Sequence, residues 1–117
     1  MNTTTAITLD IPGLHILSTR KGAKGEMIIE VESTPNSAIC HRCGVETHEF
    51  HSLDRPIMLR HLPHLGQMVL LEICLKRYQC PHCTGNPTTT QQPDWYESYS
   101  PHTRAYDAWL LHPFQSS

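Results

Sequence analysis

The sequence predicts a small α+β fold that is mostly β, with an N-terminal hairpin, an antiparallel sheet and a short C-terminal helix. Three observations predict it. Short runs alternate apolar with polar residues, glycines stand between these runs, and a Ser-Pro pair begins the last periodic stretch. The length of 117 residues fits one domain, and 38% hydrophobic residues suffice for a modest core.

The N-terminal region predicts a β-hairpin. Residues 1–5, MNTTT, are polar, and we expect a disordered tail there. Residues 6–33 contain the apolar runs ITLDIPGLHILS and EMIIEVES, separated by KGAKG, whose glycines can adopt positive φ. The pattern predicts an antiparallel hairpin with Lys21 and Lys24 at its tip, and a solvated turn explains these lysines better than a binding tip does.

A second β segment is expected at residues 67–79, QMVLLEICLKRYQ. Its period of two places one apolar face opposite a mixed face. The apolar face contains Val69, Leu71, Ile73 and Leu75, and the mixed face contains Leu70, Glu72, Cys74, Lys76 and Tyr78. Two prolines exclude a long helix within residues 55–65, so the pattern predicts an antiparallel partner at Pro56–Arg60 and a turn at Gly66.

The last third of the chain predicts a loop and then a helix. TGNPTTTQQP, residues 84–93, has no apolar period and indicates a linker. In residues 94–117, Ser100 is expected to cap a helix that has Pro101 at its first position. One face of that helix would contain Ala105, Trp109 and Leu110.

Two Cys-x-x-Cys pairs, Cys40 with Cys43 and Cys80 with Cys83, are the strongest functional signal. In a reducing compartment such pairs indicate metal or redox sites more often than disulfides. Zinc prefers four sulfur or nitrogen ligands, and each pair can present two thiolates to one ion. The 36 residues between the pairs suffice for a hairpin-based zinc ribbon. We therefore expect one zinc ion bound by the four cysteines.

The expected domain boundaries follow from the β patterns and the two Cys pairs. Residues 6–93 are expected to form a zinc-binding β domain, in which the zinc-ribbon-like antiparallel sheet covers residues 38–85. Gly44 and Gly85 follow the two Cys pairs, where glycine lets the backbone turn its amides toward sulfur.

Other roles for these side chains stay open. A rubredoxin-like iron centre for electron transfer uses the same ligands, and a redox pair is a third interpretation. Cys74 lies in the middle of the expected strand, so we expect a small buried residue there. Four histidines near the pairs are expected to face solvent or a partner: His41, His48, His51 and His82.

The charge pattern restricts nucleic-acid binding to one part of the chain. A net charge of −2 argues against sequence-independent DNA affinity spread over the whole surface. Residues 53–83 are the only net-basic part. The candidates for DNA contact are Arg55, Arg60, Lys76 and Arg77, with His61 as a companion, and a solvated sheet face is a nearly equal explanation.

The order of these pieces resembles the N-terminal zinc-binding module of bacterial insertion-sequence transposases of the ISL-three family. The most specific part spans residues 55–83: an Arg-Pro segment, the turn HLPHLG, an aliphatic strand, and Lys76, Arg77 and Tyr78 before the second Cys pair. The resemblance implies a zinc cofactor and recognition of double-stranded DNA at the transposon ends. It also implies other transposase subunits or a homo-oligomer as partners.

In that family a helix-turn-helix segment and an acidic catalytic domain follow the module. The chain stops at Ser117, so we expect residues 94–117 to begin the helix-turn-helix region, and we expect no enzymatic activity from this chain.

A different class is a stand-alone zinc ribbon that binds protein. Its partner surface would contain Trp95, Tyr96, Trp109 and Leu110. In either class the chain has no apolar run of membrane-spanning length and no signal-peptide pattern, so we expect a cytoplasmic protein without membrane contact.

Overall fold

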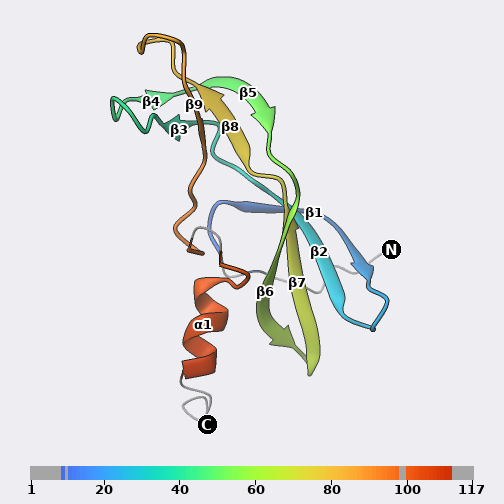
Figure 1. Ribbon diagram of the computed structural model, residues 1–117. Coiled ribbons are helices and arrows are strands. Elements are labelled where there is room, and N and C mark those ends of the chain that lie inside the picture. Colours follow the sequence, from blue (N-terminus) through green and yellow to red (C-terminus); the bar gives the residue numbers. More distant parts are fainter. Residues whose placement is uncertain (1–8, 10, 98–99, 112–117) are drawn as a thin grey trace.

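The computed structural model describes residues 9, 11–97 and 100–111 of the chain, so the expected tail at residues 1–5 lies outside the described residues. It contains nine strands and one helix within these residues (Figure 1). Their bounds are β1 Leu14–Lys21, β2 Met27–Ser33, β3 Ala38–Ile39, β4 Glu46–Thr47, β5 Glu49–Leu53, β6 Ile57–His64, β7 Gln67–Ile73, β8 Lys76–Gln79, β9 Thr88–Thr90 and α1 Arg104–Leu111. The expected fold class, mostly β with a short C-terminal helix, is confirmed.

The lower sheet in Figure 1 has the strand order β1-β2-β7-β6. β1 and β2 form the predicted N-terminal hairpin, and β6 pairs antiparallel with β7 as predicted. β2 and β7 run parallel, which joins the two hairpins into one sheet. This parallel pairing was not predicted, because alternation within a strand does not show which strand lies beside it.

A two-residue turn connects β6 to β7. Gly66 has a φ of +77°, as expected for a turn, and Leu65 before it also has a positive φ of +51°. Positive φ at both central residues is the requirement of a type I′ hairpin turn, whose twist matches that of the strands. β6 also contains a bulge between His61 and His64, where the register with β7 shifts by one residue.

The expected single strand at residues 67–79 is wrong in one respect, because it is divided into β7 and β8 at Cys74 and Leu75. The partners change at this point: β7 pairs with β2 and β6, whereas β8 pairs with β5 and β9 in a second, three-stranded sheet. Tyr78 is buried against the ring of Phe50, in spite of its place on the mixed face.

The expected linker at residues 84–93 is also wrong in part. Thr88–Thr90 form β9 and pair antiparallel with β8. Threonine is β-branched and favours extended backbone, so a short edge strand forms here without any apolar alternation. We call β3, β4, β5, β8 and β9, together with the two Cys loops, the metal end of the molecule. It lies at the top of Figure 1.

The hydrophobic core lies on one face of the four-stranded sheet. The predicted apolar face of β7 is confirmed, because Val69, Leu71, Ile73 and Leu75 are all buried. Neighbouring strands and the flanking segments complete the cluster with Ile11, Ile29, Val31, Leu59 and Tyr96. Burial of such side chains is the main favourable contribution to folding in a domain of this size.

The C-terminal segment covers the outer edge of β6 (Figure 1). Arg60 donates its backbone N–H to the carbonyl of Pro101 at 2.8 Å, and Thr103 donates to the carbonyl of Arg60 at 2.9 Å. These bonds occupy backbone groups that an edge strand otherwise exposes. α1, with eight residues, is too short to cross a bilayer, and the described residues contain no other helix.

The predicted helix start is wrong by three residues. Thr103 caps α1, because its hydroxyl oxygen accepts the N–H of Tyr106 at 3.1 Å. Ser100 instead accepts the N–H of His102 in the preceding turn, which is fixed by the bonds to β6.

The residue that the helix buries lies outside the apolar face expected from the sequence. Tyr106 is its buried residue, whereas Ala105, Trp109 and Leu110 are exposed. The helix packs on β6 over its first turn, so the register of that contact selects Tyr106. Trp95 and Tyr96, which a protein-binding ribbon would present to its partner, instead pack against the core.

Candidate metal centre and basic surface

The first Cys loop follows β3 and returns the chain to β4. Cys40 donates its backbone N–H to the carbonyl of Val45 at 2.9 Å, and Gly44 donates to the carbonyl of Cys40 at 2.9 Å. Gly44 has a φ of +75°, a conformation that glycine adopts without steric cost. The loop therefore turns the N–H of Arg42 toward the Cys40 sulfur, at 3.4 Å.

The second Cys loop connects β8 to β9 in a similar way. Cys80 donates its N–H to the carbonyl of Pro87 at 2.9 Å, and Asn86 donates to the carbonyl of Cys83 at 3.1 Å. Gly85 and Asn86 both have positive φ, +85° and +48°, and these are the residue types that tolerate it best. Each loop thus presents two thiols on a tight hairpin.

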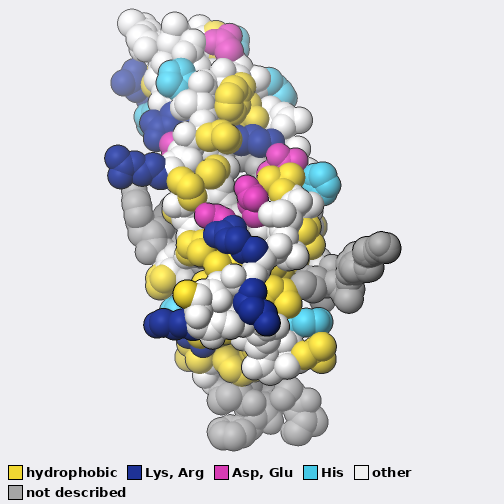
Figure 2. Space-filling model, turned by 90° about the vertical axis from the view of Figure 1, so that its right-hand side faces the viewer, with side chains coloured by type: hydrophobic (Ala, Val, Ile, Leu, Met, Phe, Trp, Pro, Cys, Tyr) yellow, Lys and Arg dark blue, Asp and Glu magenta, His cyan; other side chains and the backbone are white. Residues whose placement is uncertain are grey.

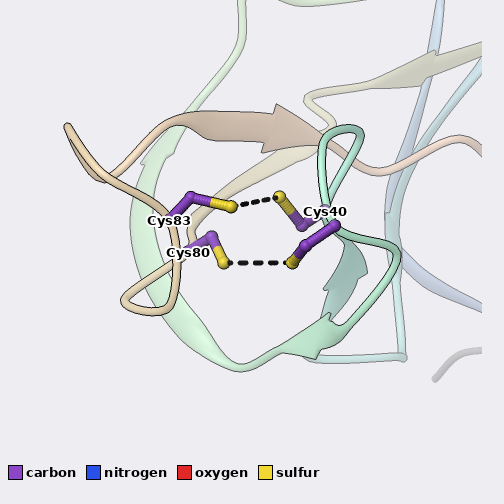
Figure 3. A group of neighbouring side chains, drawn as sticks. Cys40, Cys80 and Cys83 are labelled. Carbon is purple, nitrogen blue, oxygen red and sulfur yellow. Dashed lines mark hydrogen bonds between the residues drawn. The ribbon is translucent and has the colours of Figure 1, made fainter.

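The four sulfur atoms converge between the two loops (Figure 3). The Sγ atoms of Cys40 and Cys83 lie 3.9 Å apart, and those of Cys43 and Cys80 lie 3.7 Å apart. All four lie within 4.8 Å of one another. Four sulfurs at about 2.3 Å from a tetrahedral zinc ion stand about 3.8 Å apart, so the arrangement has the dimensions of a metal site. Disulfides are excluded, because their sulfurs approach to about 2.05 Å.

The surroundings of the thiols shift their pKa values in different directions. Backbone N–H groups of Cys43 and Arg42 point at the Cys40 sulfur and lower the pKa of that thiol to about 6. Burial and the neighbouring thiols raise the pKa of Cys83 to about 12, and burial also raises the pKa of Cys80. A cation between the sulfurs favours the thiolate form of every ligand, which offsets the cost of their burial.

Hydrogen bonds hold the two loops in register. The Thr47 hydroxyl of β4 donates to the carbonyl of Gln79, the residue before Cys80, at 2.5 Å. On the other side, the hydroxyl of Thr89 in β9 accepts the backbone N–H of His41 at 3.2 Å. Thr47 therefore connects the strand after the first Cys loop to the strand before the second. Thr89 connects the strand after the second Cys loop to the first loop itself.

Gln91 extends this connection to the four-stranded sheet. Its amide oxygen accepts the hydroxyl of Ser33 at 2.6 Å, and its amide nitrogen donates to the carbonyls of Pro35 and Ser37 at 2.8 and 3.0 Å. Gln91 is buried, so all these bonds form away from solvent. It fixes the segment that leads from β2 to the first Cys loop. Sequence analysis missed this residue because it lies in the polar stretch assigned to a linker.

The other candidate ligands lie outside the cluster. His48, just before β5, and His51, within β5, are both exposed. His82 is exposed within the second Cys loop, as expected. His41 is exposed but its Nδ1 lies 2.8 Å from the Thr89 hydroxyl. Cys74 is half-buried at the junction of β7 and β8, where burial and the charges of Glu72 and Glu30 raise the pKa of its thiol.

Two of the predicted DNA-contact residues take part in contacts within the molecule. Arg77 forms an ion pair with Asp54, in which Nε at 3.0 Å and Nη2 at 2.7 Å both donate to Oδ1. The Lys76 ammonium group donates to the carbonyl of Ser33 at 2.9 Å and to the side chain of Asn36 at 3.0 Å. The charge of Arg77 is thus neutralised locally, whereas Lys76 has only neutral partners within the part of the chain that the structure describes.

The other two predicted residues are less constrained. Arg55 is exposed and lines an open groove of about 610 Å³ together with Asp54, Arg77 and Gln92. Arg60 lies on the opposite strand face from the core, and its guanidinium stacks over the ring of Tyr106 at 5.1 Å. Neither forms an ion pair with a described carboxylate. Arg55 and Arg77 thus line one groove, whereas Lys76 lines another hollow. Figure 2 shows Lys and Arg side chains interspersed with hydrophobic and acidic ones on the face it presents.

Comparison with known proteins identifies the segment that contains this centre. Residues 36–83 match the family model of the zinc-finger of transposase IS204/IS1001/IS1096/IS1165. The match extends from the strand before the first Cys loop to the last ligand of the second. No curated protein and no solved structure matches the chain. The resemblance to ISL-three transposases is thus confirmed over this stretch, which contains the four-cysteine centre and matches the zinc-finger family of these transposases.

Proposed function

We propose that the chain is a zinc-binding and DNA-binding module of an insertion-sequence transposase, which recognises the ends of the element. The observation that carries the proposal is the convergence of four cysteines inside the segment that matches a transposase zinc finger. A function in DNA transposition gives both the metal centre and the basic residues of this segment a role.

The metal we propose is zinc, held by Cys40, Cys43, Cys80 and Cys83. A tetrahedral site of four thiolates suits zinc and iron alike, and the zinc-finger family favours zinc. Four protein ligands leave zinc no open position for water, so its role is structural. Metal analysis should give one zinc per chain, and a red protein with visible bands that bleach on reduction would show an iron centre instead.

The DNA contact we propose uses Arg55, Arg60 and Lys76, the predicted residues whose charges no described carboxylate neutralises. Arg77 has a place in the same groove as Arg55, but its pairing with Asp54 reduces its contribution. Three net positive side chains displace about three counterions. We therefore expect weak binding, with a slope of log affinity against log salt no steeper than about −3.

A titration with matched charge changes tests this contact. The double variant Arg55→Gln/Arg60→Gln should weaken binding to a duplex and make the salt slope shallower by about 2. The control is Arg20→Gln/Arg104→Gln, which removes the same charge at two exposed residues paired with Glu72 and Glu97. Equal affinity of both variants and wild type, or no binding even at low salt, would exclude this function. We also expect no strand cleavage by the chain with magnesium.

A second candidate, a protein-interaction module, has one specific observation in its favour. Trp109 and Leu110 are 38% and 49% exposed on α1, and the ring centroid of Trp109 lies 5.6 Å from that of Tyr106. Exposed apolar side chains of this size often form interfaces. If Trp109→Gln/Leu110→Gln changes the elution volume of the chain in size-exclusion chromatography and leaves DNA binding intact, this surface binds protein.

A further inference from the structure

The turn between β6 and β7 combines two unfavourable features. Leu65 is 93% exposed, more than any other large hydrophobic side chain in the described part of the chain. Its φ of +51° lies in the left-handed region, where Asn or Gly is favoured and a bulky side chain is uncommon. Folding alone favours neither feature, and an outlier of this kind indicates a functional requirement.

The same turn is held rigidly. Pro63 lies within the bulge of β6 just before it, and Gly66 completes the two-residue connection. On the other side, the Gln67 side chain donates to the carbonyl of Gly25 at 2.6 Å, which joins this turn to the turn of the β1–β2 hairpin. In Figure 1 both turns lie at the end of the sheet remote from the Cys loops. Leu65 is therefore presented on a fixed, narrow projection.

The hollow beside Leu65 is lined by apolar side chains, one lysine and one glutamate. A shallow hollow of about 520 Å³ lies between the two turns, lined by Leu65, Met68 and Lys24 among others, and Met68 is 39% exposed. Lys21 and Lys24 are exposed and form no ion pair with the described residues. The carboxylate of Glu26 in this hollow accepts the backbone N–H of Lys24 at 2.8 Å, so it is engaged by its own turn.

We propose that Leu65 is an apolar wedge that inserts between base pairs of double-stranded DNA, while Lys21 and Lys24 contact the flanking phosphates. This inference rests on the proposed function and adds DNA deformation to it. Leucine and methionine wedges unstack base steps and bend the duplex in proteins that bind the minor groove. The charges select DNA over a protein partner, because stacked bases offer apolar surface between two chains of anionic phosphates.

The wedge lies within reach of the proposed contact residues. Leu65 follows Arg60 by five residue steps, a length of about 16 Å along an extended strand. This corresponds to about five base-pair steps of about 3.4 Å. One duplex along β6 can therefore meet Arg60 and the turn together.

The decisive variant is Leu65→Asn, tested in the full zinc-loaded chain. Asn followed by Gly is the preferred type I′ turn sequence, so the variant should melt at the same temperature as wild type or higher. The probe is a duplex with 2-aminopurine at TA steps, which are easily unstacked. Wild type should increase its fluorescence on binding. Leu65→Asn should bind about tenfold more weakly and give no increase, because the apolar side chain is lost.

Two further variants control this experiment. Leu65→Met keeps an apolar wedge and should retain the fluorescence increase. Leu111→Asn removes a leucine that is 76% exposed at the end of α1, and it should behave as wild type. A wild-type fluorescence increase in Leu65→Asn would overturn the wedge, as would a lower melting temperature, which would show that Leu65 stabilises the fold.

The outcomes separate the wedge from the proposed function. If wild type binds DNA through Arg55 and Arg60 but gives no fluorescence increase on any duplex, the wedge alone is excluded. If wild type binds no duplex, the proposed function is excluded with it. If Leu65→Asn changes self-association in size-exclusion chromatography and leaves DNA unstacking unchanged, the turn contacts protein, which also overturns the wedge.

Discussion

The four-stranded sheet buries aliphatic side chains between its inner face and the C-terminal segment, whereas the metal end buries thiols and hydrogen-bonded polar groups. Ile29, Leu71 and Ile73 are 0–1% exposed in the sheet. At the metal end the buried residues include Cys40, Cys80 and Thr47, while Phe50 and Leu53 remain more than half exposed. The comparison shows that one continuous chain can use two different means of stabilisation in adjacent sheets.

The contrast follows from geometry. β5–β6 and β7–β8 form one long two-stranded ribbon that crosses from the metal end into the four-stranded sheet (Figure 1). Each part has a third strand beside it, β2 in the four-stranded sheet and the three-residue β9 at the metal end, but the apolar cluster lies over the four-stranded sheet. The metal end is too small for a comparable apolar layer, so we expect it to depend on metal for its free energy of folding.

The largest expected effect is that of metal removal. Chelation, or Cys40→Ser, should unfold the metal end, because structural zinc contributes on the order of 10 kcal/mol in small zinc-binding peptides. Amide hydrogen exchange should show protection lost in β3, β4, β5, β8 and β9 and retained longest in β2 and β7. Unchanged zinc content and melting temperature in Cys40→Ser would contradict the four-thiolate site. Equal loss of protection in both sheets would remove the distinction between them.

The second largest effect is expected from a substitution in the apolar core of the four-stranded sheet. Leu71→Ala removes a side chain that is 0% exposed, so the free energy of unfolding should fall by about 2–5 kcal/mol. The matched control is Leu70→Ala, next to it on the half-buried face of β7, with a smaller loss. Denaturant unfolding measures both. Zinc content should stay at one per chain in each variant, and loss of zinc in Leu71→Ala would show that the core also forms the metal site.

The sequence predicted well wherever one short pattern contains its own physical reason. Alternation predicted the buried residues of β7, glycines predicted the turns, and the spacing of Cys40, Cys43, Cys80 and Cys83 predicted the residues that converge. In each case the residues that interact lie close in sequence or repeat an unusual residue type, so no knowledge of the remaining chain is needed.

The features that were predicted wrongly, or not predicted, all depend on contacts between segments that are distant in sequence. Thr88–Thr90 form a strand because β8 offers them an edge, and Thr103 rather than Ser100 caps α1 because β6 binds the preceding turn. The sequence around Gln91 is typical of a loop, and its structural role depends on hydrogen bonds with the distant residues Ser33 and Pro35. The parallel pairing of β2 with β7 is the same kind of fact. Tertiary contacts override local propensity in such cases.

The third effect concerns the junction of the two sheets. Asp54 accepts the hydrogen bonds of Arg77, and its second oxygen accepts the hydroxyl of Thr90 at 2.7 Å. Asp54→Asn should therefore lower the free energy of unfolding by about 1–2 kcal/mol, since this is a charge-assisted contact that is partly exposed. Asp94→Asn, at an exposed position, is the control and should change little.

The pH dependence of the Asp54 effect has a definite sign. Burial raises the pKa of the carboxyl group, but the hydrogen bonds from Thr90 and Arg77 and the charge of Arg77 outweigh it, so the pKa lies below 3.8. The ionised Asp54 carboxylate therefore makes its full contribution to the free energy of unfolding above pH 3.8. This contribution is lost as pH falls through the pKa of the folded state. The difference between wild type and Asp54→Asn should stay constant from about pH 8 to about pH 5. A difference that shrinks within that range would show that Asp54 is not held in its charged form.

The smallest expected effect is that of Cys74, the fifth thiol, at the boundary between the regions. Its half-buried side chain lies on the outer face beside Glu72 and Glu30, where burial first and these charges second raise its pKa and disfavour the thiolate that zinc requires. Cys74→Ala should keep one zinc per chain and lower the free energy of unfolding by about 1 kcal/mol or less, because only part of a small side chain is removed from contact. Metal analysis with denaturant unfolding measures both quantities. Loss of stoichiometric zinc would show that Cys74 replaces one of the four ligands in solution, and a loss of stability as large as that of Leu71→Ala would extend the apolar core across the junction into the metal end.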